Sequence, residues 1–325
     1  MNATTIEHPQ HAARPARRFL PLFAAALLAC AQAGAAAPSC SGSAPSGELR
    51  AERIAAAVST RAGFSLYEGP VWIGDSLYFS EFGDGPAFPS RIRRLAPDGS
   101  VVTALEDSGS NGLAVDAGGA LIVASHKDKA LLRRSPVDGK PVSLAGAYQG
   151  QPFNSPNDIA VARDGTVYFT DPDWQQAAAP GRQPVTGVYR VGTDGAVTLV
   201  DGSRKNPNGI GLSPDEATRY VGALDGVLRA YPIAGGKPQL PGKDLVTGLD
   251  GPDGITVDCQ GNLYVTEHGA KRVRVFSAQG KELATIRVDA NVTNAAFGGK
   301  DGRTLYITGA KALWSIPLGI TGKPY

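Results

Sequence analysis

The sequence lacks the short motifs of several large enzyme classes. It contains no His-Glu-x-x-His, no Gly-x-Ser-x-Gly, no Gly-Lys-Ser/Thr phosphate loop and no Gly-x-Gly-x-x-Gly following a strand. The sequence therefore gives no motif evidence for a zincin, a serine hydrolase, or a nucleotide-binding or dinucleotide-binding protein.

Charge of one sign is also missing. The chain has 32 Lys and Arg against 30 Asp and Glu, without a run of basic residues. Such a chain has no electrostatic footprint for nucleic acid or for an anionic membrane. We therefore expect a small molecule as the partner, no nucleic acid, no membrane association once the leader described next is removed, and a monomer.

Apolar runs are short, and the clearest one lies near the N-terminus. Arg14, Arg17 and Arg18 precede an apolar stretch at 19–31 and the small residues Ala33-Gly34-Ala35. This order predicts a signal peptide at 1–35, too short in its apolar part to span a bilayer. Twin-arginine and lipoprotein variants fit less well, so we expect a periplasmic or secreted bacterial protein. Residues 36–51, rich in Ser, Gly, Pro and Ala, are expected to form a flexible leader.

Cysteine is scarce, with three residues in the whole chain. Cys30 would leave with the signal peptide, and Cys40 and Cys259 would remain in an oxidising compartment. A disulfide between them and a pair of free thiols are both open. Neither cysteine has a neighbouring His or helix start that would activate it for catalysis.

Glycine and proline are abundant, with 41 and 24 residues, and they accompany a repeat. Six times a polar residue, usually followed by Gly and apolar residues, leads through a turn into a strand rich in aromatic and β-branched residues. The second strands of these units begin at residues 77, 121, 167, 219, 263 and 305, which is a period of 42 to 52 residues. This is the period of a sheet-based repeat, not of a helical solenoid.

The repeat predicts an all-β fold, a six-bladed β-propeller over residues 52–325. The last unit offers only three clear strands, which would leave an open sheet edge. We expect the N-terminal segment 54–59 to pair with that edge and close the ring.

The propeller geometry predicts a site. The first strand of each blade lines the central channel, so residues at its start converge on one axis. These residues include Glu68, Asn157, Asn208 and Asp253. Each of these positions alone fits a turn residue, but two carboxylates and two amides in one register favour a hard cation such as Ca²⁺. Zn²⁺, Mg²⁺ and Mn²⁺ are further possibilities.

The second strands end on the face where the first strands begin. Polar and aromatic residues just beyond or at these ends are expected to form the wall of a substrate pocket. Among them, His126 and Trp174 are predicted to contact the substrate, and His126, His268 or Glu81 could move a proton. The set comprises Glu81, His126, Asp171, Asp173, Trp174, Glu267 and His268.

The ordered set of motifs resembles the SMP-30/gluconolactonase/luciferin-regenerating-enzyme-like family over roughly residues 52–318. The residues that carry the resemblance are Glu68-Gly-Pro-Val-Trp, Asn154-Ser-Pro-Asn-Asp, Pro207-Asn-Gly, Pro252-Asp-Gly and Thr293-Asn-Ala-Ala-Phe-Gly-Gly. The resemblance implies one divalent cation, usually Ca²⁺, and hydrolysis of sugar lactones.

Residue roles follow from the same resemblance. It implies that Glu68, Asn208 and Asp253 hold the cation, that Asn157 contacts the metal or the substrate, and that Asp253 doubles as the general base. Asn111 and Asp158 are expected to support the site and the substrate. Because a carboxylate bound to a dication is a poor base, another group could move the proton.

The sequence therefore predicts an exported, metal-dependent lactonase acting on an aldonolactone. The alternative interpretation is a non-catalytic propeller that binds a partner and in which the ion has a structural role only. A phosphotriester hydrolase using the same metal is the other enzymatic reading, because a cation activates a carbonyl or a phosphoryl group alike.

Overall fold

A computed structural model describes residues 1, 40–85, 88–136, 140–174 and 183–323. The chain divides into two units, Met1–Ala36 and Ala37–Tyr325, and every described strand belongs to the second. The predicted signal peptide at 1–35 lies outside the described residues except for Met1. Among the described residues there is no helix, and hence none that could cross a membrane.

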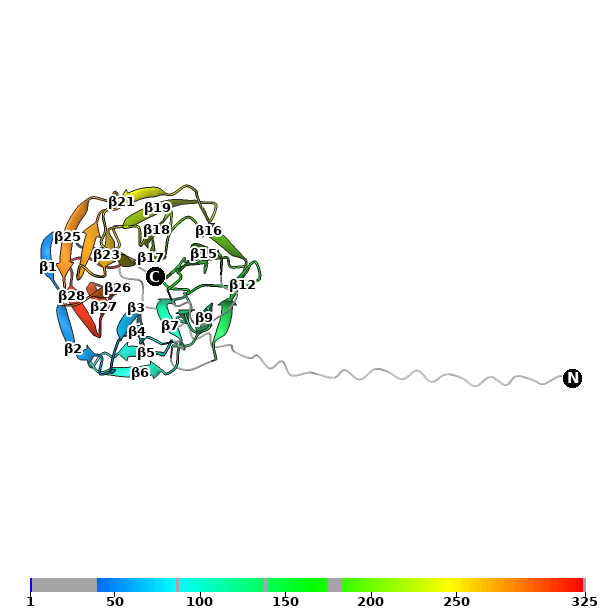
Figure 1. The fold of residues 1–325 in the computed structure, drawn as a ribbon, viewed down its shortest axis with the longest axis horizontal. Coiled ribbons are helices and arrows are strands. Elements are labelled where there is room, and N and C mark those ends of the chain that lie inside the picture. Colours follow the sequence, from blue (N-terminus) through cyan, green and yellow to red (C-terminus); the bar gives the residue numbers. More distant parts are fainter. Residues whose placement is uncertain (2–39, 86–87, 137–139, 175–182, 324–325) are drawn as a thin grey trace, which may run out of the picture. The chain divides into compact units, whose positions relative to one another are not determined.

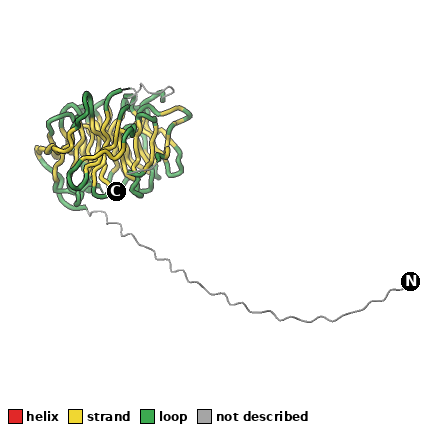
Figure 2. Tube along the Cα trace, turned by 90° about the horizontal axis from the view of Figure 1, so that it is seen from below, coloured by secondary structure: helices red, strands yellow, loops and turns green. Residues whose placement is uncertain are grey.

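Six sheets are arranged around a common axis in a six-bladed β-propeller, as predicted (Figure 1). The innermost strands β3, β7, β13, β17, β22 and β26 contact one another in this order, and β26 returns to β3. From the side, the strands occupy the middle of the propeller and the loops gather at its two faces (Figure 2).

The first three blades follow one another along the chain. Blade 1 contains β3 (Leu66–Ile73), β4 (Ser76–Phe82), β5 (Ser90–Leu95) and β6 (Val101–Leu105); blade 2 contains β7 (Ser110–Val115), β8 (Leu121–Ser125), β9 (Ala130–Arg134) and β10 (Val142–Ala145); the hairpin β11 (Ala147–Tyr148) and β12 (Gln151–Pro152) follows; blade 3 contains β13 (Ile159–Val161), β14 (Val167–Asp171), β15 (Gly187–Val191) and β16 (Val197–Asp201).

The last three blades complete the ring. Blade 4 contains β17 (Pro207–Leu212), β18 (Thr218–Ala223), β19 (Val227–Ala234), β20 (Lys237–Pro238) and β21 (Lys243–Val246); blade 5 contains β22 (Pro252–Val257), β23 (Leu263–Glu267), β24 (Arg272–Phe276), β25 (Glu282–Arg287) and β1 (Gly47–Arg50); blade 6 contains β26 (Val292–Gly298), β27 (Thr304–Gly309), β28 (Ala312–Pro317) and β2 (Glu52–Val58).

The N-terminal strand closes blade 6. Strand β2 pairs antiparallel with β28, which confirms the predicted closure by the segment near 54–59. The preceding strand β1 was not predicted: it lies within the range 36–51 that was expected to be a flexible leader, and it pairs in parallel with β25. Its pattern is short and mostly exposed, so nothing in its hydrophobic periodicity distinguishes it from a loop.

The inner strands are buried on both faces because each blade packs between two others. All seven residues of β4 and all seven of β26 are buried, whereas the outer strand β6 has none that is. Aromatic and β-branched side chains fill the space between blades, as in the cluster around Ile122, Phe153 and Tyr189. The near-continuous apolar character of the second strands follows from this double burial.

A β-bulge at the start of the first strand positions the channel side chains. The register of β3 on β4 shifts between Glu68 and Val71, and comparable shifts occur at the starts of β7, β17, β22 and β26. A bulge redirects a side chain relative to the strand. The repeated bulge therefore gives most blades the same polar projection toward the axis.

Glycine follows several of these polar residues because the neighbouring blade approaches closely. A Cβ atom on Gly112 would lie 2.0 Å from the carbonyl oxygen of Asn157, and one on Gly209 would lie 2.0 Å from that of Asp253. The Gly112 amide instead donates to Asn157 O at 3.0 Å. In each Asn-Gly pair, the asparagine thus directs a polar side chain toward the axis, and the glycine allows close backbone contact with the neighbouring blade.

Segments near residues 40 and 321 contact each other and blade 5 on the face opposite the beginnings of the inner strands. Cys40 and Cys259 form a disulfide, with 5.2 Å between their Cα atoms. The amide of Cys259 donates to Thr321 O at 3.0 Å, and the amide of Thr321 donates to Ser41 O at 3.3 Å. The C-terminal segment around Thr321 therefore lies between the start of the described propeller unit and blade 5.

Candidate active site

The starts of the first strands surround a cavity of about 420 Å³. It is lined by residues from all six blades, including the loops that follow β8, β14, β18 and β23. The lining residues are Phe64, Leu66, Glu68, Phe82, Asn111, His126, Asn157, Trp174, Asn208, Leu224, Gly251, Pro252, Asp253, His268, Gly269 and Thr293.

The structure brings the four expected cation ligands together in this cavity. Glu68, Asn157, Asn208 and Asp253 all line it, although they come from four different blades. Asn111 lines it as well. Glu68, Asn157 and Asn208 are buried, with 4%, 4% and 6% exposure, so their polar groups need partners.

Three amide oxygens in the cavity have no hydrogen-bond partner among the described residues. The Oδ1 atoms of Asn111, Asn157 and Asn208 are buried and make no hydrogen bond within the described part of the protein. The Nδ2 group of Asn208 donates to Asp253 Oδ1 at 2.6 Å, which fixes the amide and leaves its oxygen available. A buried acceptor of this kind is costly unless a ligand satisfies it.

The carboxylates of the cavity carry unfavourable negative charge. Burial, then the charges of Asp253 and Asp158, raise the pKa of Glu68 well above its usual range. Burial also raises the pKa of Asp253, against the opposite effect of its contact with His268. A bound cation would supply positive charge, which would stabilise the ionised form of these carboxylates.

The donor set of the four expected cation ligands consists of carboxylate and amide oxygens. Across the residues that the structure describes, no cluster of three or more His, Cys, Asp or Glu side chains is arranged to hold a metal ion. The cavity offers two carboxylates and three unpartnered amide oxygens instead. Oxygen ligands that include amides are those that Ca²⁺ accepts.

His268 contacts Asp253. Its Nδ1 atom lies 3.4 Å from Asp253 Oδ2, and the His268 side chain is 36% exposed. Through this contact Asp253 raises the pKa of His268. Both oxygens of Asp253 therefore have a partner, with Asn208 on one and His268 on the other. His268 was expected in the pocket wall, but its pairing with Asp253 was not.

His126 and Trp174 line the cavity too. The His126 ring is buried against Phe88, with 4.5 Å between the ring centroids. Burial, helped by the positive charge of Lys129, lowers the pKa of His126 to about 3. His126 is therefore neutral near pH 7 and suits hydrogen bonding to a ligand better than uptake of a proton.

The structure places Glu81 and Glu267 elsewhere, which corrects their expected location in the pocket wall. Glu81, the residue before the last in β4, is fully buried and forms ion pairs with Arg91 and Arg93 at 2.8 and 2.9 Å. Glu267 is likewise buried and contacts Arg272 and Arg274. Arg91 and Arg93 both contact Oε2 of Glu81, whose Oε1 accepts from Ser59 and Ser65. Oε1 of Glu267 also accepts the backbone amide of Asp250. Neither carboxylate lines the cavity.

Asp171 and Asp173 also do not line it. The Asp171 carboxylate accepts the backbone amides of Asn154 and Ser155 at 2.8 and 2.6 Å, which fastens the loop before Asn157. Burial raises the pKa of Asp171 to about 7. The backbone amide of Asp173 donates to Asn206 Oδ1 at 3.0 Å.

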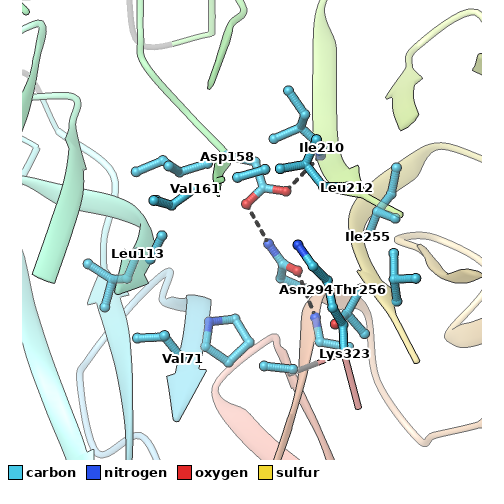
Figure 3. Close-up of a pocket in the computed structure, with 18 of the residues that line it drawn as sticks. Val71, Leu113, Asp158, Val161, Ile210, Leu212, Ile255, Thr256, Asn294 and Lys323 are labelled. Carbon is cyan, nitrogen blue, oxygen red and sulfur yellow. Dashed lines mark hydrogen bonds between the residues drawn. The ribbon is translucent and has the colours of Figure 1, made fainter. Parts of the chain in front are cut away.

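Asp158 lies deeper in the channel than expected for a substrate-binding residue. It lines a second, smaller cavity of about 80 Å³ with Asn294 and apolar residues from the middle of the first strands (Figure 3). Its oxygens accept Ile210 N at 2.9 Å and Asn294 Nδ2 at 3.2 Å. Burial raises the pKa of Asp158 to about 7. Lys323, from the C-terminal segment, reaches the same cavity (Figure 3).

Comparison with known proteins identifies the family of this chain. Residues 66–311 match the SMP-30/Gluconolactonase/LRE-like region. The chain belongs to this family. The matched range contains all six first strands and every expected cation ligand of the SMP-30/gluconolactonase-like site.

Relatives of known name lie within the same family. A gluconolactonase from Zymomonas mobilis is 32% identical over 275 residues, covering 74% of this chain and 75% of the relative. A pentonolactonase from Haloferax volcanii is 30% identical over 266 residues, covering 75% and 81%. Among solved structures, a gluconolactonase from Xanthomonas campestris superposes with a TM-score of 0.71 at 29% identity, covering 86% of this chain and 100% of that one.

Proposed function

We propose that the protein is a metal-dependent lactonase that hydrolyses a sugar lactone of the aldonolactone type. The gluconolactonase and pentonolactonase relatives support hydrolysis of a lactone. The observation that carries the proposal is the cavity that joins two carboxylates to three buried amide oxygens without partners.

Four residues would hold the cation: Glu68, Asn157, Asn208 and Asp253. Their oxygen-only donor set favours Ca²⁺, and Mg²⁺, Mn²⁺ and Zn²⁺ are the alternatives to compare. A bound dication would polarise the lactone carbonyl and orient the attacking water.

The side chains around the ligands define the remaining roles. We assign proton uptake from the water to Asp253, because its contacts with Asn208 and His268 fix both oxygens within the cavity. Glu81 is not available for this step, since two arginines hold it outside the cavity. Neutral His126 and the amide of Asn111 would hydrogen-bond the substrate.

The test is lactone hydrolysis in a pH-stat, with Ca²⁺ and after exhaustive chelation, for the wild type, Asp253→Asn and Glu68→Gln. If Asp253 is the base as well as a ligand, its variant should stay roughly 10²-fold slower or more at saturating metal, whereas Glu68→Gln should recover. A phosphotriester arm detects the alternative hydrolase. Turnover that is indifferent to both substitutions and to chelation would place the active site elsewhere.

We also propose that the protein is exported. The Cys40–Cys259 disulfide is compatible with an oxidising compartment. Fractionation of cells with a periplasmic marker, and sedimentation of the purified protein to check the expected monomer, are the direct measurements.

A further inference from the structure

Large apolar side chains gather at the mouth of the cavity. Among the described residues nine large hydrophobic side chains are exposed, and three of them, Phe64, Trp174 and Leu224, line this one cavity. They include both exposed aromatic residues, since the remainder are Met1, Leu240 and four valines. Exposed apolar groups that cluster, unlike scattered ones, mark a binding surface.

Three separate loops supply these side chains. Phe64 precedes β3, Trp174 follows β14 and Leu224 follows β18, so residues up to 160 positions apart in the chain meet at one opening. Each is substantially exposed, at 49%, 38% and 49%. Packing of the blades does not require them, because they lie outside the buried clusters between the strands.

Most polar groups of the cavity lie deeper. Asn111, His126 and Thr293 are 3%, 2% and 2% exposed, in the same range as Glu68, Asn157 and Asn208. His268 lies nearer the mouth, with a side chain that is 36% exposed. Half-buried Leu66 and buried Phe82 and Pro252 continue the apolar wall inward. The cavity is therefore amphipathic, with most hydrogen-bonding groups inside and a largely apolar rim.

We propose that the lactone substrate carries an apolar substituent, an alkyl chain or an aryl ring, which lies against Phe64, Trp174 and Leu224 while the lactone ring occupies the polar interior. This inference rests on the proposed hydrolysis of a lactone, and it names a lactone with an apolar substituent as the preferred substrate in place of an unsubstituted aldonolactone. A volume of about 420 Å³ is in the range of sites for drug-sized ligands, so ring and substituent can be accommodated together. A fully hydroxylated ring alone would leave the rim exposed to water.

The test compares matched δ-lactones that differ only in the substituent: unsubstituted δ-valerolactone, its 6-alkyl homologues of increasing length, and glucono-δ-lactone. Full burial of one methylene contributes about 0.8 kcal/mol, and a half-exposed wall gives less. We expect kcat/KM of the holoenzyme to rise roughly twofold for each of the first few methylenes. Phe64→Ser and Leu224→Ser should flatten this dependence on chain length.

The matched control is Val142→Ser. Val142 is also exposed, at 64%, but it lies on the outer strand β10 and does not line the cavity. This variant should keep the full dependence on chain length. A kcat/KM that is independent of chain length, or highest for glucono-δ-lactone, would overturn the apolar subsite and leave the lactonase function intact.

Binding separates the two proposals when turnover is absent. Isothermal titration with δ-valerolactam and its 6-hexyl derivative, which the enzyme does not open readily, should show at least tenfold tighter binding of the hexyl compound and loss of that preference in Leu224→Ser. This result without hydrolysis of any lactone would support the subsite and contradict the proposed reaction. Equal affinities would overturn the subsite.

Discussion

Asn208 donates its Nδ2 hydrogen to Asp253 Oδ1 at 2.6 Å, across the boundary between blades 4 and 5. The same amide keeps its Oδ1 atom buried and unpartnered. One side chain thus orients a carboxylate and presents an oxygen to the cavity. The relationship makes Asn208 the best single probe of the proposed cation site.

Asn208→Ala should weaken Ca²⁺ binding by roughly 10-fold to 100-fold, the range typical of residues that orient metal ligands. Isothermal titration measures the affinity. Asn154→Ala is the matched control, because Asn154 also has a buried Oδ1 without a partner but does not line the cavity. Equal losses in both variants would show that the effect is structural and not local to the site.

Glu68→Gln should stabilise the metal-free protein at neutral pH while reducing the stabilisation by Ca²⁺. The folded pKa of Glu68 is raised, so the folded state retains a proton that the unfolded chain releases. The free energy of unfolding of the metal-free wild type should therefore fall as pH rises above about 4.5, and the variant should lack this contribution. Thermal unfolding in chelator and in Ca²⁺, at several pH values, measures both effects. A metal-free variant less stable than the wild type would contradict the charge argument.

His126 and Asp171 should give folding stability opposite pH dependences. The pKa of His126 is lowered from 6.5 to about 3, so the unfolded chain binds more protons and stability falls as pH drops from 6.5 toward 3. The pKa of Asp171 is raised from 3.8 to about 7, so stability falls as pH rises through that window. His126→Gln and Asp171→Asn should each remove one slope in urea unfolding between pH 4 and 8. Parallel curves for all three proteins would contradict both assignments.

Glu81→Gln should destabilise the fold by about 1 to 3 kcal/mol, because it leaves two arginines without their buried partner. Lactone hydrolysis should stay within about twofold of the wild type once the variant is folded, since Glu81 lies outside the cavity. Chemical denaturation and kcat at low temperature measure the two effects. A large loss of kcat in folded protein would return Glu81 to the catalytic machinery.

Removal of the N-terminal strands should have graded effects. A chain beginning at residue 51 loses β1 and the disulfide but keeps β2, and should unfold at a moderately lower temperature. A chain beginning at residue 60 also loses β2, which exposes the edge strand β28, and should be much less stable and prone to aggregate. Equal melting temperatures for the two truncations would show that β2 contributes little to closure.

The sequence predicted the propeller and the converging polar residues because both depend on a period. The repeat sets which residue begins each inner strand, and ring closure then brings Glu68 and Asp253 to one cavity. The roles of these residues remain predictions. Loop residues carry no such period, so the pairing of His268 with Asp253 and the rim formed by Phe64 and Leu224 could not be derived.

The expected position of Glu81 was wrong for a different reason. A carboxylate at the end of a strand has the same sequence signature whether it faces a ligand or an ion-pair partner. The sequence signal for these ion pairs lies on the next strand. Arg91 and Arg93 share one face of that strand opposite Glu81, and Arg272 and Arg274 share one face of theirs opposite Glu267. Strand β1 gave no signal either, because its four residues are mostly exposed.

The pairing of β2 with β28 constrains the order in which the protein can fold. Five blades obtain their first four strands from one continuous stretch of chain, but the fourth strand of blade 6 is contributed by residues some 260 positions earlier. Such a distant contact forms late, since the entropy of closing the intervening loop is lost before the pairing is gained. A nascent chain can therefore assemble its early blades while it is still being made, yet the ring stays open until the last residues have arrived.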